Sequence, residues 1–370
     1  MHKGGARVDK RVWKQRLAAG ARIGAVLAAV AVVSALPFDW AQVGRAATLL
    51  AAGLQQPHNA AQVLGERLTT IEDTPSQSVI ATPSTAPSAG DHTTISPAET
   101  PSVPATVAPK ENGSGGKVIE RKLDVGDARK YGIAVRNSSG KSVDIAAALS
   151  AKLVPTFTDT DAPQVLIIHT HTTEQYMTYA AGYYNANDRE RTTDHTRNVC
   201  AVGDAMVKAL AAHGITAIHD TTVHDSPYSG AYTRSAKTVQ NYLEKYPSIQ
   251  VVLDLHRDAL MEGQSGLVKP TVTVDGKKAA QMMIIAGVLS TDALTNPHTA
   301  QNLALAAQWQ KLLTDRYDGL MRPLSTVGSR YNQHLHAGYL LVEVGSEGNT
   351  VAEAEYSGEL LGKTLAELLK

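Results

Sequence analysis

Between residues 117 and 370 the chain alternates short apolar runs with longer amphipathic segments. Six runs are predicted strands: APQVLIIHTH (162–171), ITAIHD (215–220), IQVVLDLHRD (249–258), TVTVDG (271–276), QMMIIAGV (281–288) and GYLLVEVGS (338–346). Apolar residues at helical spacing predict helices over 195–214, 232–247, 298–317 and 351–370. Continuous apolar strands alternating with helices are typical of a parallel sheet covered on both faces. We therefore predict an α/β fold with a largely parallel central sheet flanked by helices.

One part of this pattern departs from the parallel arrangement. The stretch TVTVDGKKAAQMMIIAGV (271–288) alternates apolar and polar residues around Asp275 and Gly276. An Asp-Gly pair between alternating segments favours a two-residue hairpin turn. We expect a β-hairpin there.

The N-terminus has a different character. Residues 1–16 carry six Lys or Arg and one Asp, and residues 17–38 are apolar except for Arg22 and Ser34. A helix of this length reaches roughly 30 Å, which is one hydrocarbon core. The basic flank predicts a cytoplasmic tail at 1–16 followed by a single transmembrane anchor at 17–38. The alternative is a cleaved signal peptide ending near VSA, and both alternatives export the remaining chain from the cytoplasm.

Residues 39–116 form the predicted extracytoplasmic linker. From residue 74 to 116 the composition is dominated by Pro, Ser, Thr, Ala and Gly, with few large apolar residues. Such a segment buries too little surface to fold, so we expect it to be largely disordered and to act as an extended tether. The chain is thus divided into tail, anchor, linker and a folded domain at 117–370.

Composition excludes several kinds of site. The chain has 35 basic and 35 acidic residues, and a net charge of zero gives no indication of nucleic-acid binding. Cys200 is the only cysteine, so an intrachain disulfide and a multi-cysteine zinc site are excluded. Its place in a helical pattern favours a small core residue. Any metal must then be held by His, Asp or Glu.

Ionisable groups follow three of the predicted strands. Sites in open α/β sheets gather beyond the carboxyl ends of the strands. The groups at these ends are His169, His171 and Glu174, then Asp254, His256, Arg257 and Asp258, and last Glu343. Each motif alone is more often structural than catalytic, but their coincidence at three strand ends predicts a functional site.

The residue types fit a hydrolytic zinc site. Such sites use three ligands from His, Asp or Glu and leave one position for water. His171 and Glu174 have the spacing His-x-x-Glu, which places both on one side of a turn, and His256 would be the third ligand. Glu343 would then be free to act as the general base.

Three neighbouring residues have open roles. If the strand pleat continues, His169 points the same way as His171, so it is either a rival ligand or a contact to substrate or to a ligand. Asp254 could orient a ligand histidine. Arg257 could bind a carboxylate or steady an oxyanion.

The other polar residues are expected to have ordinary roles. We expect Arg191 and Arg197 to form surface salt bridges. We also expect surface or loop positions for His195, His213, His219, His224, His298, Asn332, Gln333, His334 and His336.

Several motifs together resemble the stage II sporulation protein P family. They are HTHTTE, HDSPYSGAYTRS, DLHRDA and LLVEVGSEGN, they occur in register, and the resemblance runs from about residue 118 to the C-terminus. Lys269 and Thr273 depart from the arginine-containing hairpin common in the family, which puts a substrate-binding role for this loop in doubt.

The resemblance implies a zinc-dependent peptidoglycan hydrolase with the fold of N-acetylmuramoyl-L-alanine amidases, akin to zinc carboxypeptidases. It implies cleavage of the bond between N-acetylmuramic acid and L-alanine, together with endopeptidase activity on cross-links. It also implies partners in sporulation, a lytic transglycosylase (sporulation protein D) and a membrane protein (sporulation protein M). Carried over by motif, the zinc ligands are His171, Glu174 and His256, and Glu343 is catalytic.

Two other functions are compatible with parts of the sequence. One is a zinc carboxypeptidase acting on peptides, and the other is a wall-binding module without catalysis. Four ionisable groups retained at strand ends argue against the inert module.

Overall fold

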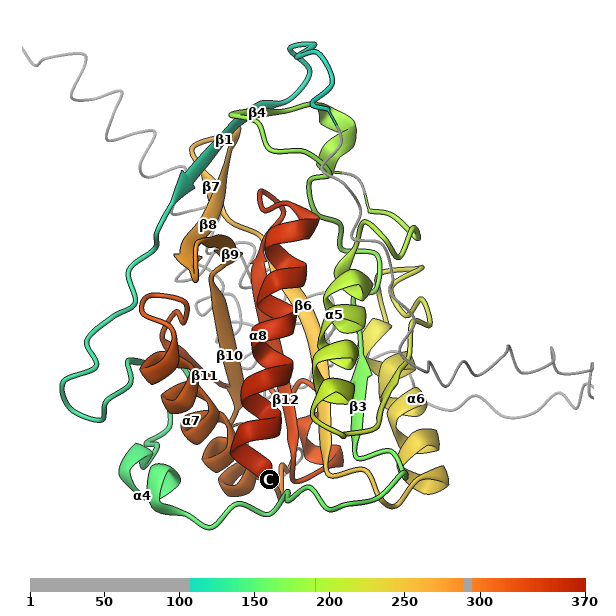
Figure 1. The fold of residues 1–370 in the computed structure, drawn as a ribbon, viewed down its shortest axis with the longest axis vertical. Helices are drawn as coiled ribbons and strands as arrows, with labels where there is room; N and C mark the ends of the chain where they lie inside the picture. The colour runs from blue at the N-terminus through green and yellow to red at the C-terminus, as the bar shows by residue number, and fades with distance from the viewer. Residues whose placement is uncertain (1–106, 190, 289–294) are drawn as a thin grey trace, which may run out of the picture. The chain divides into compact units, whose positions relative to one another are not determined.

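The computed structural model describes residues 107–189, 191–288 and 295–370 (Figure 1). The predicted anchor at 17–38 and most of the predicted linker at 39–116 lie outside these ranges. Among the described residues, no helix is long and apolar enough to cross a membrane.

A seven-stranded sheet forms the centre of the fold. Its spatial order is β2 (Val135–Asn137), β11 (Leu324–Val327), β10 (Met282–Gly287), β12 (Tyr339–Ser346), β6 (Val251–Asp258), β3 (Val165–Ile168) and β5 (Ala217–His219). Neighbouring strands are parallel except for β10 and β12, which are antiparallel. The predicted largely parallel sheet is therefore confirmed.

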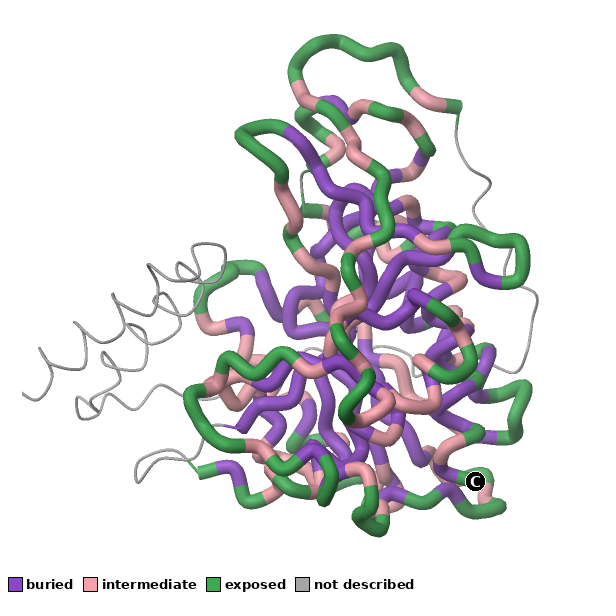
Figure 2. The backbone as a smooth tube through the Cα atoms, turned by 90° about the vertical axis from the view of Figure 1, so that its left-hand side faces the viewer, coloured by how far each residue is buried: buried purple, intermediate pink, exposed green. Residues whose placement is uncertain are grey.

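Helices cover both faces of this sheet. The helices are α4 (Ile145–Ser150), α5 (Val199–Ala212), α6 (Ala231–Lys245), α7 (Thr299–Arg316) and α8 (Val351–Leu369). Figure 1 shows α5, α7 and α8 in front of the strands. Along β3, Val165 and Ile167 pack into the core beneath α5, α7 and α8, whereas Leu166 and Ile168 pack into a second core with α6. This alternation explains why the strand is apolar and buried at every position. Figure 2 shows in purple the buried segments at the centre of the fold.

Local sequence signals fix the helix ends beside the strands. Asn198 caps α5 by accepting a hydrogen bond from the Cys200 backbone. Thr350 and Glu353 form a capping box at the start of α8. Such caps satisfy backbone N–H groups that have no partner within the helix.

A smaller sheet was not predicted from the sequence. It contains β4 (Tyr183–Tyr184), β1 (Gly116–Arg121), β8 (Gly266–Val274) and β7 (Met261–Glu262), with β9 (Lys277–Ala280) paired to β8. The predicted hairpin is confirmed as β8–β9, and both turn residues have positive φ, as the turn type requires. Two short 3₁₀ helices, η1 (Ala186–Arg189) and η2 (Gln333–Leu335), complete the described elements.

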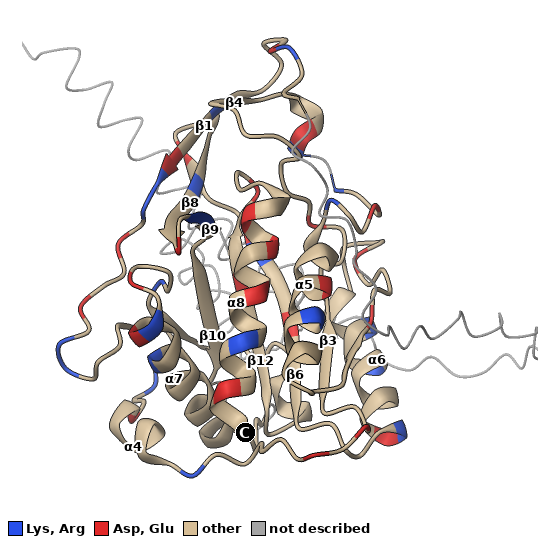
Figure 3. Ribbon diagram, in the orientation of Figure 1, with Lys and Arg blue, Asp and Glu red and all other residues tan. Residues whose placement is uncertain are grey.

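Charged residues of both signs are interspersed on the surface. In Figure 3, acidic positions predominate along the visible side of α8, with a basic position among them towards its C-terminal end. Lys363 and Glu359 pair there across one helical turn. This pattern agrees with the zero net charge of the chain.

Candidate metal centre

The turn after β3 brings two of the predicted ligands together. The Glu174 backbone N–H donates to the His171 carbonyl at 3.1 Å, which closes the turn. His171 Nδ1 lies 3.4 Å from Glu174 Oε1. Asp225 anchors the turn by accepting from the Thr173 hydroxyl at 2.6 Å. The His-x-x-Glu spacing therefore produces a pair on one side of the turn.

The third predicted ligand comes from the neighbouring strand β6. His256 Nδ1 lies 3.6 Å from Glu174 Oε2. The imidazole rings of His171 and His256 meet edge to face, with their centroids 4.9 Å apart. One ligand atom from each of His171, Glu174 and His256 lies within 4.8 Å of the others. All three residues are at least 94% buried, since their exposed fractions are 1%, 6% and 3%. The structure thus gathers the three residues at the carboxyl ends of adjacent parallel strands.

Asp254 joins the turn to β6. Its Oδ1 accepts from the Thr170 backbone N–H at 2.7 Å, and its Oδ2 accepts from the Thr170 hydroxyl at 2.6 Å. His256 Nε2 lies 2.9 Å from Oδ1, close enough for an ion pair but not aligned as a hydrogen bond. The contact is therefore electrostatic. Asp254 thereby fixes the orientation of His256 and leaves Nδ1 facing Glu174.

Buried carboxylates dominate the electrostatics of the site. Burial acts to raise the pKa of Glu174, but contact with His171 and the charge of His256 outweigh it and hold the pKa well below its ordinary value. Burial acts to lower the pKa of His256, but Asp254 and Glu174 outweigh it and raise the pKa to about 10. The site therefore favours positive charge between its carboxylates.

These residues fit a divalent metal ion. Two imidazoles and one carboxylate are a donor set typical of catalytic zinc. His171 Nε2 is buried without a hydrogen-bond partner in the described part of the chain. With both histidines neutral, the carboxylates of Glu174 and Asp254 would balance a charge of +2. His171, Glu174 and His256 would hold the ion, with Asp254 orienting His256.

Glu343 lies next to this group on β12. It is the register partner of His256 across the parallel β6–β12 pair. Its Oε2 is buried and has no hydrogen-bond partner among the described residues, although the residue as a whole keeps some exposure. Burial and the nearby charge of Asp258 raise the pKa of Glu343 to about 8. A carboxylate without a partner beside a metal site is available for proton transfer.

Arg257 and His169 occupy different surroundings. The Arg257 backbone N–H donates to Glu174 Oε2 at 3.0 Å, while its Nε donates to the Gln175 carbonyl at 2.8 Å. His169 is fully buried and turns away from the ligands, with its Nδ1 2.9 Å from the Leu255 carbonyl. The geometry favours His171 over His169 as the ligand.

Aromatic residues from α6 and the preceding loop form a wall that the sequence analysis missed. Tyr228 stacks on His171 at 4.6 Å, and Tyr232 stacks on His256 at 6.4 Å. Tyr228 keeps 39% of its surface exposed, so it borders the approach to the site. The motif HDSPYSGAYTRS carries both tyrosines and was the available signal.

Several expected surface residues are buried instead. His224 is 2% exposed, and its Nδ1 lies 2.8 Å from the His169 carbonyl, so its predicted surface position is wrong. The side chain of His219 is only 9% exposed, so the surface prediction is wrong there as well. Gln333 is fully buried and bonds the backbone of β10. Arg191 pairs with buried Asp225 and reaches within 3.8 Å of Glu174, so it belongs to the rim of the site.

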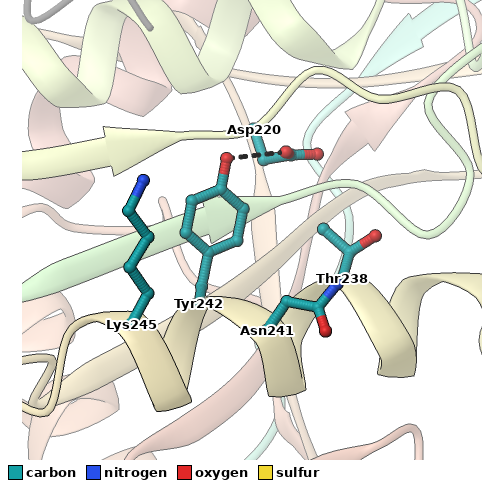
Figure 4. A pocket seen from close by; sticks show the side chains of 5 residues that line it. All are labelled: Asp220, Thr238, Asn241, Tyr242 and Lys245. Atoms are coloured by element: carbon teal, nitrogen blue, oxygen red, sulfur yellow. Dashed lines mark hydrogen bonds between the residues drawn. The ribbon is translucent and has the colours of Figure 1, made fainter. Parts of the chain in front are cut away.

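A separate hollow lies between β5 and α6. It has a volume of about 260 Å³ and is lined by Asp220, Thr238, Asn241, Tyr242 and Lys245. Figure 4 shows the Tyr242 hydroxyl directed at Asp220, to which it donates at 3.0 Å. None of the candidate metal ligands lines this hollow.

Comparison with known proteins gives one family match. A profile of the family described as stage II sporulation protein P matches residues 79–366. Stage II sporulation protein P of Bacillus subtilis (strain 168) is 27% identical over 226 residues, which cover 58% of this chain. The matched region spans about half, 53%, of that relative.

Solved structures resemble the chain only weakly. The N-acetylmuramyl-L-alanine amidase Ami1 from Mycobacterium smegmatis has 12% identity and a TM-score of 0.32, covering 56% of this chain and 97% of its own. The CwlD amidase from Clostridioides difficile, solved in complex with the GerS lipoprotein, has 10% identity and a TM-score of 0.34, covering 56% and 98%. Likeness at this level says nothing about function.

Proposed function

The chain belongs to the stage II sporulation protein P family, and from that premise we propose that it is a zinc-dependent peptidoglycan hydrolase. The bond cleaved is the amide between N-acetylmuramic acid and L-alanine, and stem-peptide cross-links are a second substrate. The observation that carries this proposal is the convergence of His171, Glu174 and His256 beside Glu343. Bound zinc supplies Lewis acidity and makes water a nucleophile near neutral pH.

Glu343 is proposed to move the proton. Its buried Oε2 has no partner in the described part of the chain, so it can accept a proton from the attacking water. It would then deliver that proton to the leaving amine of the peptide. The raised pKa of Glu343 suits a group that alternates between proton acceptor and donor.

Substrate would approach past Tyr228 and Arg191. The Arg191 guanidinium lies 4.8 Å above the Tyr228 ring, and the ring covers His171. The exposed part of Tyr228 suits contact with a sugar ring, and the side of the guanidinium that does not face Asp225 suits a peptide carboxylate. Both groups therefore support a substrate that joins a sugar to an acidic peptide.

The cellular setting completes the proposal. A transmembrane anchor at 17–38 would hold the domain on the outer side of the cell membrane, where peptidoglycan lies. We assign wall remodelling during sporulation as the process, with a lytic transglycosylase and a membrane protein as partners. The family membership and the exported-chain pattern of the sequence support this setting.

One experiment separates the candidate functions. The full chain in detergent is incubated with peptidoglycan, with and without a chelator, and the products are identified by mass spectrometry. Free lactyl ends on muramic acid, lost with chelator and restored by zinc, support the amidase. Shortened stem peptides alone would indicate a zinc carboxypeptidase. Binding without any released product would indicate an inert wall-binding module.

A further inference from the structure

Two buried histidines outside the proposed catalytic group face each other. His169 follows β3 and His219 ends β5, and their Nε2 atoms lie 2.8 Å apart. His169 Nδ1 lies 2.9 Å from the Leu255 carbonyl, and His219 Nδ1 lies 2.9 Å from Asp204 Oδ1. Each ring thus has an oxygen acceptor at its far nitrogen.

The hydrogen-bond partners of His169 and His219 leave two nitrogen lone pairs facing each other. Both outer contacts end on oxygens that only accept, so each Nδ1 must carry a hydrogen. In a neutral imidazole the other nitrogen, Nε2, then has no hydrogen and carries a lone pair. Two such lone pairs would face each other across 2.8 Å. A metal ion between them would accept both lone pairs.

The outer contacts are the ones that metal-binding histidines usually make. A ligating imidazole commonly donates its other N–H to a carboxylate or a backbone carbonyl, which fixes the ring and its tautomer. Asp204 has this role for His219, and the Leu255 carbonyl has it for His169. Neither histidine contributes to the group formed by His171, Glu174 and His256.

A sulfur donor lies beside the pair. One ligand atom from each of His169, Cys200 and His219 lies within 4.8 Å of the others. Cys200 is fully buried in the first turn of α5. Gly203, one turn later, leaves space for the imidazole, because a Cβ there would lie 2.4 Å from His219 Nε2.

We propose that His169, His219 and Cys200 bind a second transition-metal ion, distinct from the proposed catalytic zinc. Two imidazoles and one thiolate suit a divalent ion of borderline softness, such as Zn²⁺ or Co²⁺. Ideal tetrahedral bonds of about 2.0–2.1 Å would place the two nitrogens roughly 3.4 Å apart. The rings must therefore separate by about half an ångström from their present spacing.

Charge balances when the ion enters. While no metal is bound, burial raises the pKa of Cys200 and keeps it a neutral thiol. Binding of a divalent ion releases the thiol proton. The charges of the ion, the thiolate and the Asp204 carboxylate then sum to zero, so the loaded site carries no net charge.

Such a site would fasten α5 to the strand that leads into the catalytic turn. His169 stands two residues before His171, and the Val199 backbone at the start of α5 donates to the Glu174 carbonyl at 2.9 Å. A metal held by Cys200 and His169 would therefore brace the turn that carries His171 and Glu174.

Cobalt substitution tests the site without any activity measurement. The full chain is purified in detergent, stripped with chelator and titrated anaerobically with Co²⁺. Since Cys200 is the only cysteine, a near-ultraviolet sulfur-to-cobalt charge-transfer band can report only this residue. We expect two equivalents of metal per chain and this band.

Variants assign each equivalent. Cys200→Ser should abolish the band and lower the bound metal from two equivalents to one, and His219→Gln should do the same. Exposed His213→Gln is the matched control and should keep both. Glu174→Gln should lose the metal equivalent bound by His171, Glu174 and His256 and keep the band. Failure of the proposed catalytic site can therefore be told apart from failure of the second site.

A titration without the charge-transfer band overturns the second site, whatever the stoichiometry. The histidine pair would then have a structural role only. Circular dichroism checks that each variant folds. If Cys200→Ser does not fold, the loss or retention of the band in His219→Gln decides the result.

Discussion

Glu343 illustrates how a residue's role follows from its surroundings. The proposed ligands lie close to one another, and Glu343 Oε2 beside them is buried without a hydrogen-bond partner in the described part of the chain. It lies opposite His256 in register and thus beside the donors without being one of them. A group so placed can move protons without leaving its position.

The first prediction concerns turnover. Glu343→Gln should keep the shape of the side chain and the bound zinc but remove the proton acceptor. The rate of peptidoglycan hydrolysis should therefore fall by about 10²–10⁴-fold. Product release from peptidoglycan, measured together with zinc content, checks this. Glu355→Gln on α8 is a matched control and should retain activity. A Glu343→Gln variant that cuts at the normal rate would show that the base has been assigned wrongly.

The second prediction concerns the stability of the metal-free protein. The unfolded chain releases the Glu343 proton near pH 4.5, whereas the folded chain holds it to about pH 8. Between these values the folded state binds more protons, so the free energy of unfolding falls as pH rises, by at most about 1.4 kcal/mol per pH unit. Glu343→Gln removes this contribution.

Urea unfolding of the chelated wild type and of Glu343→Gln, measured from pH 5 to 8, tests the sign. The stability of the wild type relative to the variant should decrease steadily with pH. Parallel curves for the two proteins would mean that burial does not disfavour the Glu343 carboxylate. The comparison cancels the titration of groups that both proteins share.

Individual residues were predictable where the motif is local. His171 and Glu174 are three apart, so one turn suffices to pair them, as the structure shows. The direction of His169 was not predictable, because the pleat stops at Ile168 and the chain enters a turn. The burial of His219 also escaped prediction, because it depends on Gly203, a residue of another element.

At the scale of elements, apolar runs and caps identified the main helices and strands. Each predicted strand has a counterpart, and α8 begins at its predicted residue. The small sheet was missed because its strands are far apart in sequence and two of them, β4 and β7, have only two residues. Lys117 of β1, for example, pairs with Gly266 of β8. A two-residue strand such as β4 leaves no periodic signal.

Lys269 departs from the arginine-containing hairpin common in the family, and the structure explains its place. This buried lysine lies 2.6 Å from Glu353 and 3.2 Å from Glu120. Glu353 also completes the capping box of α8 through the Thr350 backbone N–H, at 3.0 Å. Lys269 thus joins β8 to β1 and to the start of α8, a role independent of substrate.

The third prediction concerns the packing of α5 against α8. A Cβ at Gly358 would lie 2.6 Å from the Val202 carbonyl oxygen, and one at Gly362 would lie 2.7 Å from the Ala209 Cβ. In an open helix, Gly→Ala stabilises by about 1 kcal/mol. Here overpacking against backbone costs roughly 1–3 kcal/mol, so Gly358→Ala should lower stability.

Chemical denaturation of Gly358→Ala measures this cost. The exposed position Gln240 in α6 provides the control, where alanine should be more stable than glycine by about 1 kcal/mol. If Gly358→Ala is stabilising by a similar amount, the close approach of the two helices is not present. The adjacent Gly362→Ala should repeat the result, because its clash is also with α5.

At the scale of the whole molecule, the family resemblance seen in the sequence is confirmed by the match over residues 79–366. That match begins inside the Pro-, Ser- and Thr-rich stretch. The folded part starts before residue 117, because the carbonyls of Pro109 and Lys110 accept hydrogen bonds from Tyr183 and Asn185. The last residues of the predicted linker therefore contact the folded domain, which composition alone could not show.

The last prediction tests the tether as a spacer. Deleting residues 80–106 removes up to about 90 Å of extended reach and leaves the contacts of Pro109 and Lys110 intact. With the full chain anchored in vesicles, hydrolysis of soluble wall fragments should be unchanged, while hydrolysis of intact sacculi should fall. If a Gly/Ser segment of equal length restores hydrolysis of intact sacculi, the loss was caused by the shorter tether, since a flexible chain keeps the same reach. Failure of that replacement would instead show that the natural sequence of the segment contributes a specific interaction.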